Sequence, residues 1–193
     1  MSALGDLLAG LSGAFGEMGL RWFLFGAQAV AIRGAPRATQ DVDVTVEVPR
    51  SSLGDLIGAL ARRGFSHRFP EIADEIMRDG AVLPLTHAGS GLDLDLVLAG
   101  SGLESVALAR AEPILIAGVL VPVIAPTDLV VFKVLAGRGR DLEDVRAVLA
   151  VGGVDVDEAR DLLRQLEEAL GQSDLLPALE AALRDVGPAP GVG

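Results

Sequence analysis

The fold of this chain is decided by residues 25–44, FGAQAVAIRGAPRATQDVDV. They predict the end of one strand, a tight turn at Gly26, a short apolar helix over residues 27–32, a polar loop, and a second strand over residues 41–48. In that second strand valines alternate with polar residues, and residues two apart on a strand point to the same face. Asp41 and Asp43 therefore direct two carboxylates to one place.

Two carboxylates held this close repel each other unless a cation or a proton lies between them. We therefore expect a metal site at Asp41 and Asp43, and hard oxygen ligands favour Mg²⁺ or Mn²⁺. The turn at Gly26 and Ala27 offers backbone N–H groups, which suit a phosphate. A metal ion beside a phosphate-binding turn indicates phosphoryl or nucleotidyl transfer.

A second Asp-x-Asp pair, Asp93 and Asp95, lies in a predicted strand over residues 92–98. Two-metal nucleotidyl transfer needs three acidic groups, and either of these aspartates can supply the third. We favour Asp95, which can also act as general base toward an acceptor hydroxyl. The alternative is that these aspartates only line a solvated face of the sheet.

The rest of the pattern predicts an α/β (α+β) fold, with a small mixed sheet and packed helices over residues 1–125. A C-terminal helical bundle follows over residues 126–186, and the Gly- and Pro-rich residues 187–193 form a disordered tail. The other expected strands cover residues 21–25, 81–86, 113–117 and 119–124. The expected helices cover residues 3–18, 51–63, 101–110, 127–136, 141–149, 155–170 and 173–185, and residues 65–79 are expected to form a loop with some helix.

The composition excludes several classes of function. The chain has 193 residues, a net charge of −11 and no cysteine, so disulfides and thiolate metal sites are ruled out. An acidic chain is a poor general binder of nucleic acid. No signal peptide is evident, and the longest apolar run, residues 114–124, is too short to span a bilayer. We expect a cytoplasmic protein with no membrane partner.

Three basic or hydroxylic side chains are candidates for holding phosphate. Arg37 can bind phosphate in a bidentate manner, and Thr39 can hydrogen-bond a carboxylate or a phosphate. Lys133, which is the only lysine, is a mobile point charge that can reach a phosphate. The alternatives are that Arg37 pairs with a carboxylate, Thr39 begins a strand and Lys133 is solvated. We expect Thr127 and Asp141 to cap helices and Asp144 to lie at the surface or in an ion pair.

These residues resemble the nucleotidyltransferase superfamily with the polymerase-beta-like catalytic core, most of all the bacterial minimal and abortive-infection-toxin-like members. The resemblance covers roughly residues 20–150. It implies that a metal-bound nucleoside triphosphate such as ATP gives up a nucleoside monophosphate, with loss of pyrophosphate, to a hydroxyl of a protein, a transfer-RNA end or a small molecule. It also implies a toxin role with an antitoxin partner. The sequence departs from the family at Ala27, where Ser or Gly is common. The residues that carry the resemblance are Gly26, Arg37, Thr39, Asp41, Asp43, Asp95 and Lys133.

Two other functions are compatible with parts of the pattern. Asp-x-Asp also holds manganese and a nucleotide sugar in glycosyltransferases, but a glycine turn so shortly before Asp41 fits them badly. A degenerate, nucleotide-binding regulatory module is compatible with Ala27 and the acidic composition. The presence of all three carboxylates favours an enzyme.

Overall fold

The computed structural model describes residues 2–35, 41–100 and 102–187, which form two compact units. The first unit takes its described residues from 2–28 and 41–124, and the second takes them from 29–35 and 125–187. Residues 29–35 thus group with the C-terminal helices, although the segments on both sides of them in sequence belong to the unit that contains the sheet. Of the expected tail, only Gly187 belongs to the described residues.

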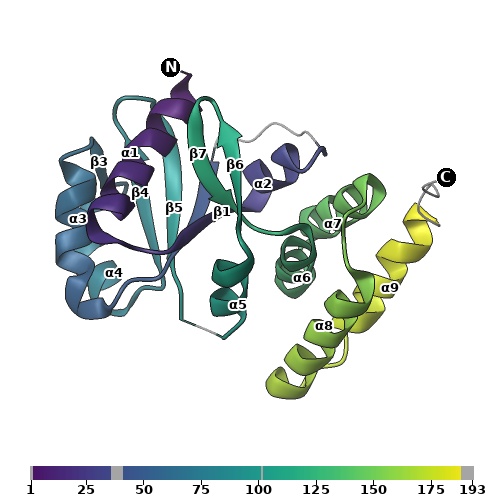
Figure 1. Cartoon of the computed structure of the whole chain (residues 1–193). Coiled ribbons are helices and arrows are strands. Elements are labelled where there is room, and N and C mark those ends of the chain that lie inside the picture. The colour runs from purple at the N-terminus through teal and green to yellow at the C-terminus, as the bar shows by residue number, and fades with distance from the viewer. Residues whose placement is uncertain (1, 36–40, 101, 188–193) are drawn as a thin grey trace. The chain divides into compact units, whose positions relative to one another are not determined.

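The first unit is built on a mixed sheet, which in the described residues has seven strands in the order β3-β4-β5-β2-β1-β7-β6 (Figure 1). This arrangement confirms the predicted fold class. The strands are β1 (Trp22–Phe25), β2 (Asp41–Val46), β3 (Phe65–His67), β4 (Val82–His87), β5 (Leu92–Leu98), β6 (Glu112–Ile116) and β7 (Val119–Val123).

Strand β2 lies in the interior of the sheet and has one buried face and one polar face. It runs antiparallel to β1 and parallel to β5. Val42, Val44 and Val46 are fully buried, whereas Asp41 is exposed and Asp43 is half-buried. The predicted alternation is confirmed from Asp41 to Val44, where it leaves the aspartates on the face opposite the core, but Thr45 is also buried and the strand ends at Val46 rather than at residue 48.

Helices α1 (Ala3–Met18) and α3 (Leu53–Ala61) lie side by side against the sheet (Figure 1). Helix α1 has the bounds that its sequence pattern predicts. The Ser2 hydroxyl accepts a hydrogen bond from the Gly5 N–H at its start, and Gly19 ends it in the left-handed conformation. The core side chains of α1 include Leu7, Leu8, Leu11 and Phe15, all fully buried. The unit also contains α4 (Ala73–Asp79), α5 (Gly102–Arg110) and two short 3-10 turns at Arg50–Ser52 and Pro70–Ile72.

The second unit is helical in its described residues. It contains the last residues of helix α2 (Gly26–Ile32), from Ala29 onward. The predicted C-terminal bundle is also part of it and consists of α6 (Pro126–Ala136), α7 (Gly139–Val151), α8 (Val156–Leu170) and α9 (Leu175–Val186). Thr127 does not cap α6, because the helix begins one residue earlier, after Ala125. Its hydroxyl instead accepts a hydrogen bond from the backbone N–H of Asp155 at 2.9 Å.

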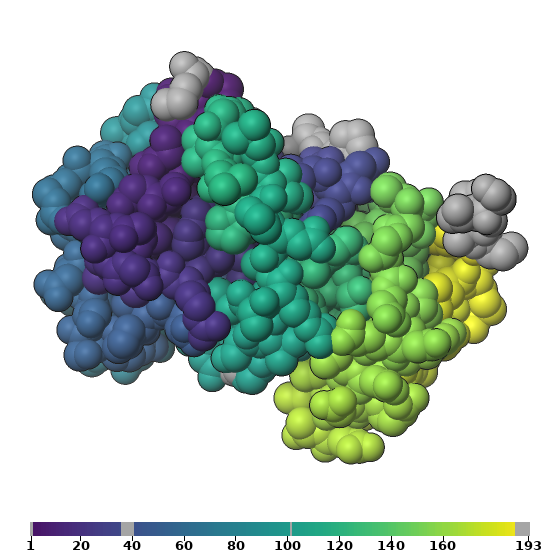
Figure 2. Space-filling view, viewed as in Figure 1, coloured from purple at the N-terminus to yellow at the C-terminus, as the bar shows by residue number. Residues whose placement is uncertain are grey.

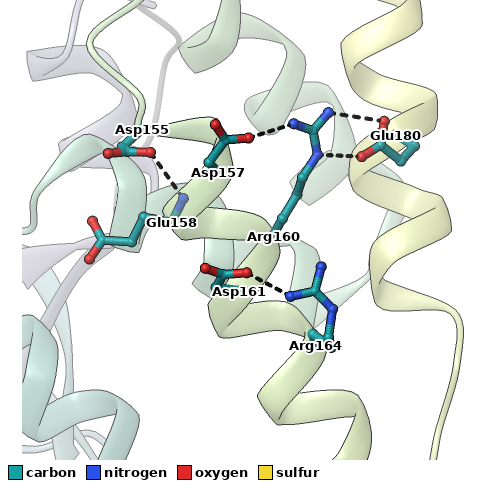
Figure 3. A network of polar contacts seen from close by, with 7 residues as sticks. All are labelled: Asp155, Asp157, Glu158, Arg160, Asp161, Arg164 and Glu180. Carbon is teal, nitrogen blue, oxygen red and sulfur yellow. Dashed lines mark hydrogen bonds and ion pairs between the residues drawn. The ribbon is translucent and has the colours of Figure 1, made fainter.

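Polar contacts tie the surfaces of α8 and α9 together (Figure 3). The Asp155 carboxylate accepts the Glu158 N–H at 2.9 Å and so caps α8. Arg160 Nε donates to Glu180 Oε1 at 2.7 Å, which joins the two helices.

The space-filling view shows the outer surface of α8 and the β6–β7 hairpin (Figure 2). Within the described ranges, no helix is long and apolar enough to cross a membrane.

Candidate active site

Four aspartates lie on the polar face of two neighbouring strands. In the parallel pairing of β2 with β5, Asp41 stands opposite Asp93 and Asp43 opposite Asp95. Leu94 of β5 is fully buried, so alternation directs Asp93 and Asp95 away from the core, as it does for Asp41 and Asp43. The sheet thus brings together the three predicted metal ligands, with Asp93 as a fourth carboxylate beside them.

Gly26 brings the backbone directly against this acidic face. It has a φ of +66°, and Phe25, the residue before it, pairs with Asp43 across the β1–β2 ladder. A Cβ atom built on Gly26 would overlap the Asp43 carboxylate, at 2.6 Å from Cγ and 2.8 Å from Cβ. Only glycine fits both the conformation and the space. Ala27 follows in the first turn of α2, with its side chain buried.

Arg68, a residue that sequence reasoning missed, pairs with both aspartates of β5. Its Nη2 atom lies 2.8 Å from Asp95 Oδ1, and its Nε atom lies 3.4 Å from Asp93 Oδ2. The Thr86 hydroxyl on β4 donates to Asp93 Oδ1 at 2.7 Å. Residues 65–79 were expected to form a loop with some helix, but not strand β3, and the pairing of β3 with β4 is what brings Arg68 to β5. Local sequence offers no signal for that pairing.

The candidate ligands are carboxylates on two adjacent strands, and carboxylate oxygens suit a hard divalent cation. In the present conformation, no three His, Cys, Asp or Glu side chains among the described residues are grouped to hold a metal ion. Asp95 is engaged by Arg68 instead. Binding of a metal ion by these residues would require the Asp95 carboxylate to leave the guanidinium.

Lys133 lies in the second unit, in a buried ion-pair cluster. Its Nζ atom is 2.7 Å from Asp141 Oδ1 and 2.8 Å from Asp144 Oδ2, and all three side chains are almost fully buried. Lys133 is therefore not the solvated residue of the alternative interpretation. Its predicted contact with phosphate stays a prediction, and that contact would require the ammonium to leave both carboxylates.

Of the two aspartates that hold Lys133, one differs from expectation. Asp141 is not the cap of α7, since Arg138 occupies that position, whereas Asp144 lies in an ion pair, which is one of its two expected placements. Burial raises the pKa of Asp141, but hydrogen bonds from Arg138 and Lys133 outweigh that effect and hold the pKa below its usual range. The sequence signal was a lone lysine inside an apolar helix, followed by Arg-Asp-x-x-Asp. Arg37 and Thr39, the other predicted phosphate ligands, lie outside the described residues.

No protein-family model and no curated protein matches the sequence. Several solved structures are similar in fold. The solution structure of the antibiotic-resistance factor ANT(2'')-Ia has a TM-score of 0.59 and 16% identity, over 89% of this chain and 97% of that one. The crystal structure of ANT(2'')-Ia in complex with adenylyl-2''-tobramycin has a TM-score of 0.55 and 17% identity, over 85% of this chain and 98% of that one.

A fungal protein gives a similar result. The antigenic nucleotidyltransferase-like protein from Paracoccidioides brasiliensis has a TM-score of 0.54 and 17% identity, over 92% of each chain. At these identities the similarity concerns the fold. With a mixed sheet, a glycine turn and paired Asp-x-Asp strands, this chain has the fold of the nucleotidyltransferases.

Proposed function

We propose that the protein is a metal-dependent nucleotidyltransferase that moves a nucleoside monophosphate from a nucleoside triphosphate to a hydroxyl group. The observation that carries the proposal is the register of β2 and β5, which pairs Asp41 with Asp93 and Asp43 with Asp95. The approach of the Gly26 backbone to Asp43 supports it further, because backbone N–H groups beside a metal ion suit a triphosphate.

Asp41, Asp43 and Asp95 would hold Mg²⁺ or Mn²⁺. When bound, the ion neutralises phosphate charge and favours ionisation of the acceptor hydroxyl. The acceptor oxygen forms a bond to the α-phosphorus, the bond from that phosphorus to the bridging oxygen breaks, and pyrophosphate leaves. Asp95, or Asp93 beside it, accepts the proton of the acceptor hydroxyl.

The triphosphate ligands follow from the same geometry. We propose that the N–H groups of Gly26 and Ala27 contact phosphate oxygens beside Asp43. Because Ala27 has no hydroxyl, the side chain at this position adds no hydrogen bond to the triphosphate. Arg37 and Thr39, in the loop before β2, are further proposed phosphate ligands.

For the substrates, we propose ATP and a small-molecule hydroxyl as the first pair to test. The support is the complex of ANT(2'')-Ia with adenylyl-2''-tobramycin, a small molecule that carries an adenylyl group. A protein hydroxyl or a transfer-RNA end are the other acceptors that the sequence resemblance implies. The toxin role and an antitoxin partner rest on that resemblance alone.

The test is the transfer of label from each of the four α-labelled nucleoside triphosphates, with Mg²⁺ or Mn²⁺. The acceptors are a panel of polyhydroxylated small molecules, cell-extract protein and total RNA. Label in one acceptor class should disappear in Asp41→Asn/Asp43→Asn and persist in Glu47→Gln, which removes a carboxylate that pairs with Arg21 four residues beyond Asp43. Nucleotide binding with no transfer to any acceptor would instead favour a regulatory nucleotide-binding module.

A further inference from the structure

Arg68 is held over β4 and β5 by its backbone and by its side chain. Its backbone N–H donates to the Pro84 carbonyl at 2.9 Å. Its Nη2 atom lies near the Leu94 carbonyl at 3.4 Å, as well as 2.8 Å from Asp95 Oδ1. The buried Nε atom makes no hydrogen bond and faces Asp93 at 3.4 Å. The guanidinium is therefore fixed against the two carboxylates of β5.

This contact resolves an electrostatic conflict on the acidic face. Asp93 and Asp95 are like charges two residues apart, and each stands opposite another aspartate on β2. Such an array is unfavourable without a positive charge beside it. Arg68 supplies that charge from within the chain, because its guanidinium donates a hydrogen bond to Asp95 and forms an ion pair with Asp93.

We propose that Arg68 is a positioning residue that competes with the divalent cation for Asp95, an inference that rests on the metal site proposed above. A cation at Asp41, Asp43 and Asp95 would lie beside a guanidinium that now contacts Asp95 Oδ1, and the two positive charges repel each other. The ion binds only when Arg68 releases Asp95. Arg68 thus lowers the affinity of the site for the metal and holds the third carboxylate in place until the metal arrives.

The first measurement is a titration of the full chain with Mn²⁺, followed by electron paramagnetic resonance. Replacing Arg68 with Gln should tighten Mn²⁺ binding about tenfold, which corresponds to removing one competing charge-assisted hydrogen bond. The matched control is Arg21→Gln, which removes the same charge from an exposed pair with Glu47. That control should leave the affinity close to that of the parent. The Arg68→Lys variant, which keeps the charge but cannot bridge two carboxylates, should be intermediate.

The second measurement separates competition from a purely structural role. Without metal, Arg68→Gln should unfold at a lower temperature than the parent, because Asp93 and Asp95 lose their cation. Added Mn²⁺ should raise the melting temperature of the variant more than that of the parent, because a ligand that binds more tightly stabilises more at the same concentration. Adding Asp95→Asn to Arg68→Gln should remove this gain.

The outcomes distinguish this proposal from the one on which it rests. If the parent binds Mn²⁺ through Asp41 and Asp43 and the Arg68→Gln variant binds it equally or more weakly, competition is wrong and the metal site stands. An equal loss of melting temperature with and without Mn²⁺ would also overturn competition. If neither protein binds Mn²⁺, the metal site itself is wrong, and the role of Arg68 falls with it.

Discussion

Gly26 shows how a single residue can be fixed by two separate physical constraints. Its positive φ disfavours any side chain, and the Asp43 carboxylate fills the space where a Cβ would lie. The sequence predicted a turn here from glycine alone. It could not predict the contact, because Asp43 is seventeen positions further along and reaches Gly26 only through the pairing of β1 with β2.

Replacing Gly26 with Ala should therefore do more damage than an ordinary turn substitution. We expect a loss of about 2–3 kcal/mol in the free energy of unfolding, together with loss of nucleotide binding, because the backbone or the Asp43 side chain must move. The matched control is Gly19→Ala, which has a φ of +64° but no atom within 4 Å of the added Cβ. It should lose only about 1 kcal/mol and keep nucleotide binding. Urea unfolding measures both variants, and equal losses would contradict the steric argument.

At the scale of elements, the strongly patterned segments were predicted well and the short, context-dependent ones were not. Helix α1 and strand β5 have the bounds that their sequence patterns predict, because periodicity over many residues reports burial directly. Strand β3 has three residues and exists through its pairing with β4. That dependence also hid Arg68, whose contacts with β5 follow from the strand order.

The pairing of α6 with α7 through Lys133 should give the protein a specific sensitivity to acid. The pKa of Asp141 is lowered from its ordinary value of 3.8, so its carboxylate stabilises the fold above that pH, and this contribution is lost as the pH falls through the lowered value. At neutral pH, Asp141→Asn should reduce the free energy of unfolding by about 3 kcal/mol, since it breaks a buried pair. The difference from the parent should shrink below pH 4.

Urea unfolding at a series of pH values from 7 to 2 checks this expectation. The control is Asp161→Asn, which breaks the exposed pair with Arg164 on α8 (Figure 3). Exposed pairs contribute little, so that variant should follow the parent at every pH. A gap between Asp141→Asn and the parent that stays constant down to pH 2 would show that the carboxylate charge does not stabilise the α6–α7 pair.

At the scale of the whole molecule, the chain passes between its two units more than once. Residues 1–125 were predicted to form one domain, yet residues 29–35 group with the C-terminal helices. Within that unit Gly34 lies beside Val151 of α7, since a Cβ on Gly34 would be 3.2 Å from Val151 Cγ1. The sequence predicts a short apolar helix over residues 27–32 but carries no information on which unit that helix joins.

A fragment of residues 1–125 should therefore fold incompletely. Ala29 and Val30 are buried in the full chain, and removing the C-terminal helices takes away the unit to which they belong. We expect amide hydrogens of α2 beyond Gln28 to lose protection from exchange in the fragment, while those of α1 keep it. Hydrogen exchange followed by mass spectrometry compares the two segments. Full protection of α2 in the fragment would support the predicted boundary instead.

Because β2 pairs with β5, the properties of the acidic face depend on where its carboxylates lie as well as on their charge. Both strands are interior, so hydrogen bonds on each side hold them about 4.8 Å apart, and alternate residues along each strand are spaced by about 6.6 Å. The backbone thus fixes the distances between the Cα atoms of these aspartates. Glutamate at Asp43 would keep the charge but move the carboxylate by about 1.5 Å, one carbon–carbon bond. With the Cα atoms fixed in this way, the position of each carboxylate matters as much as its charge.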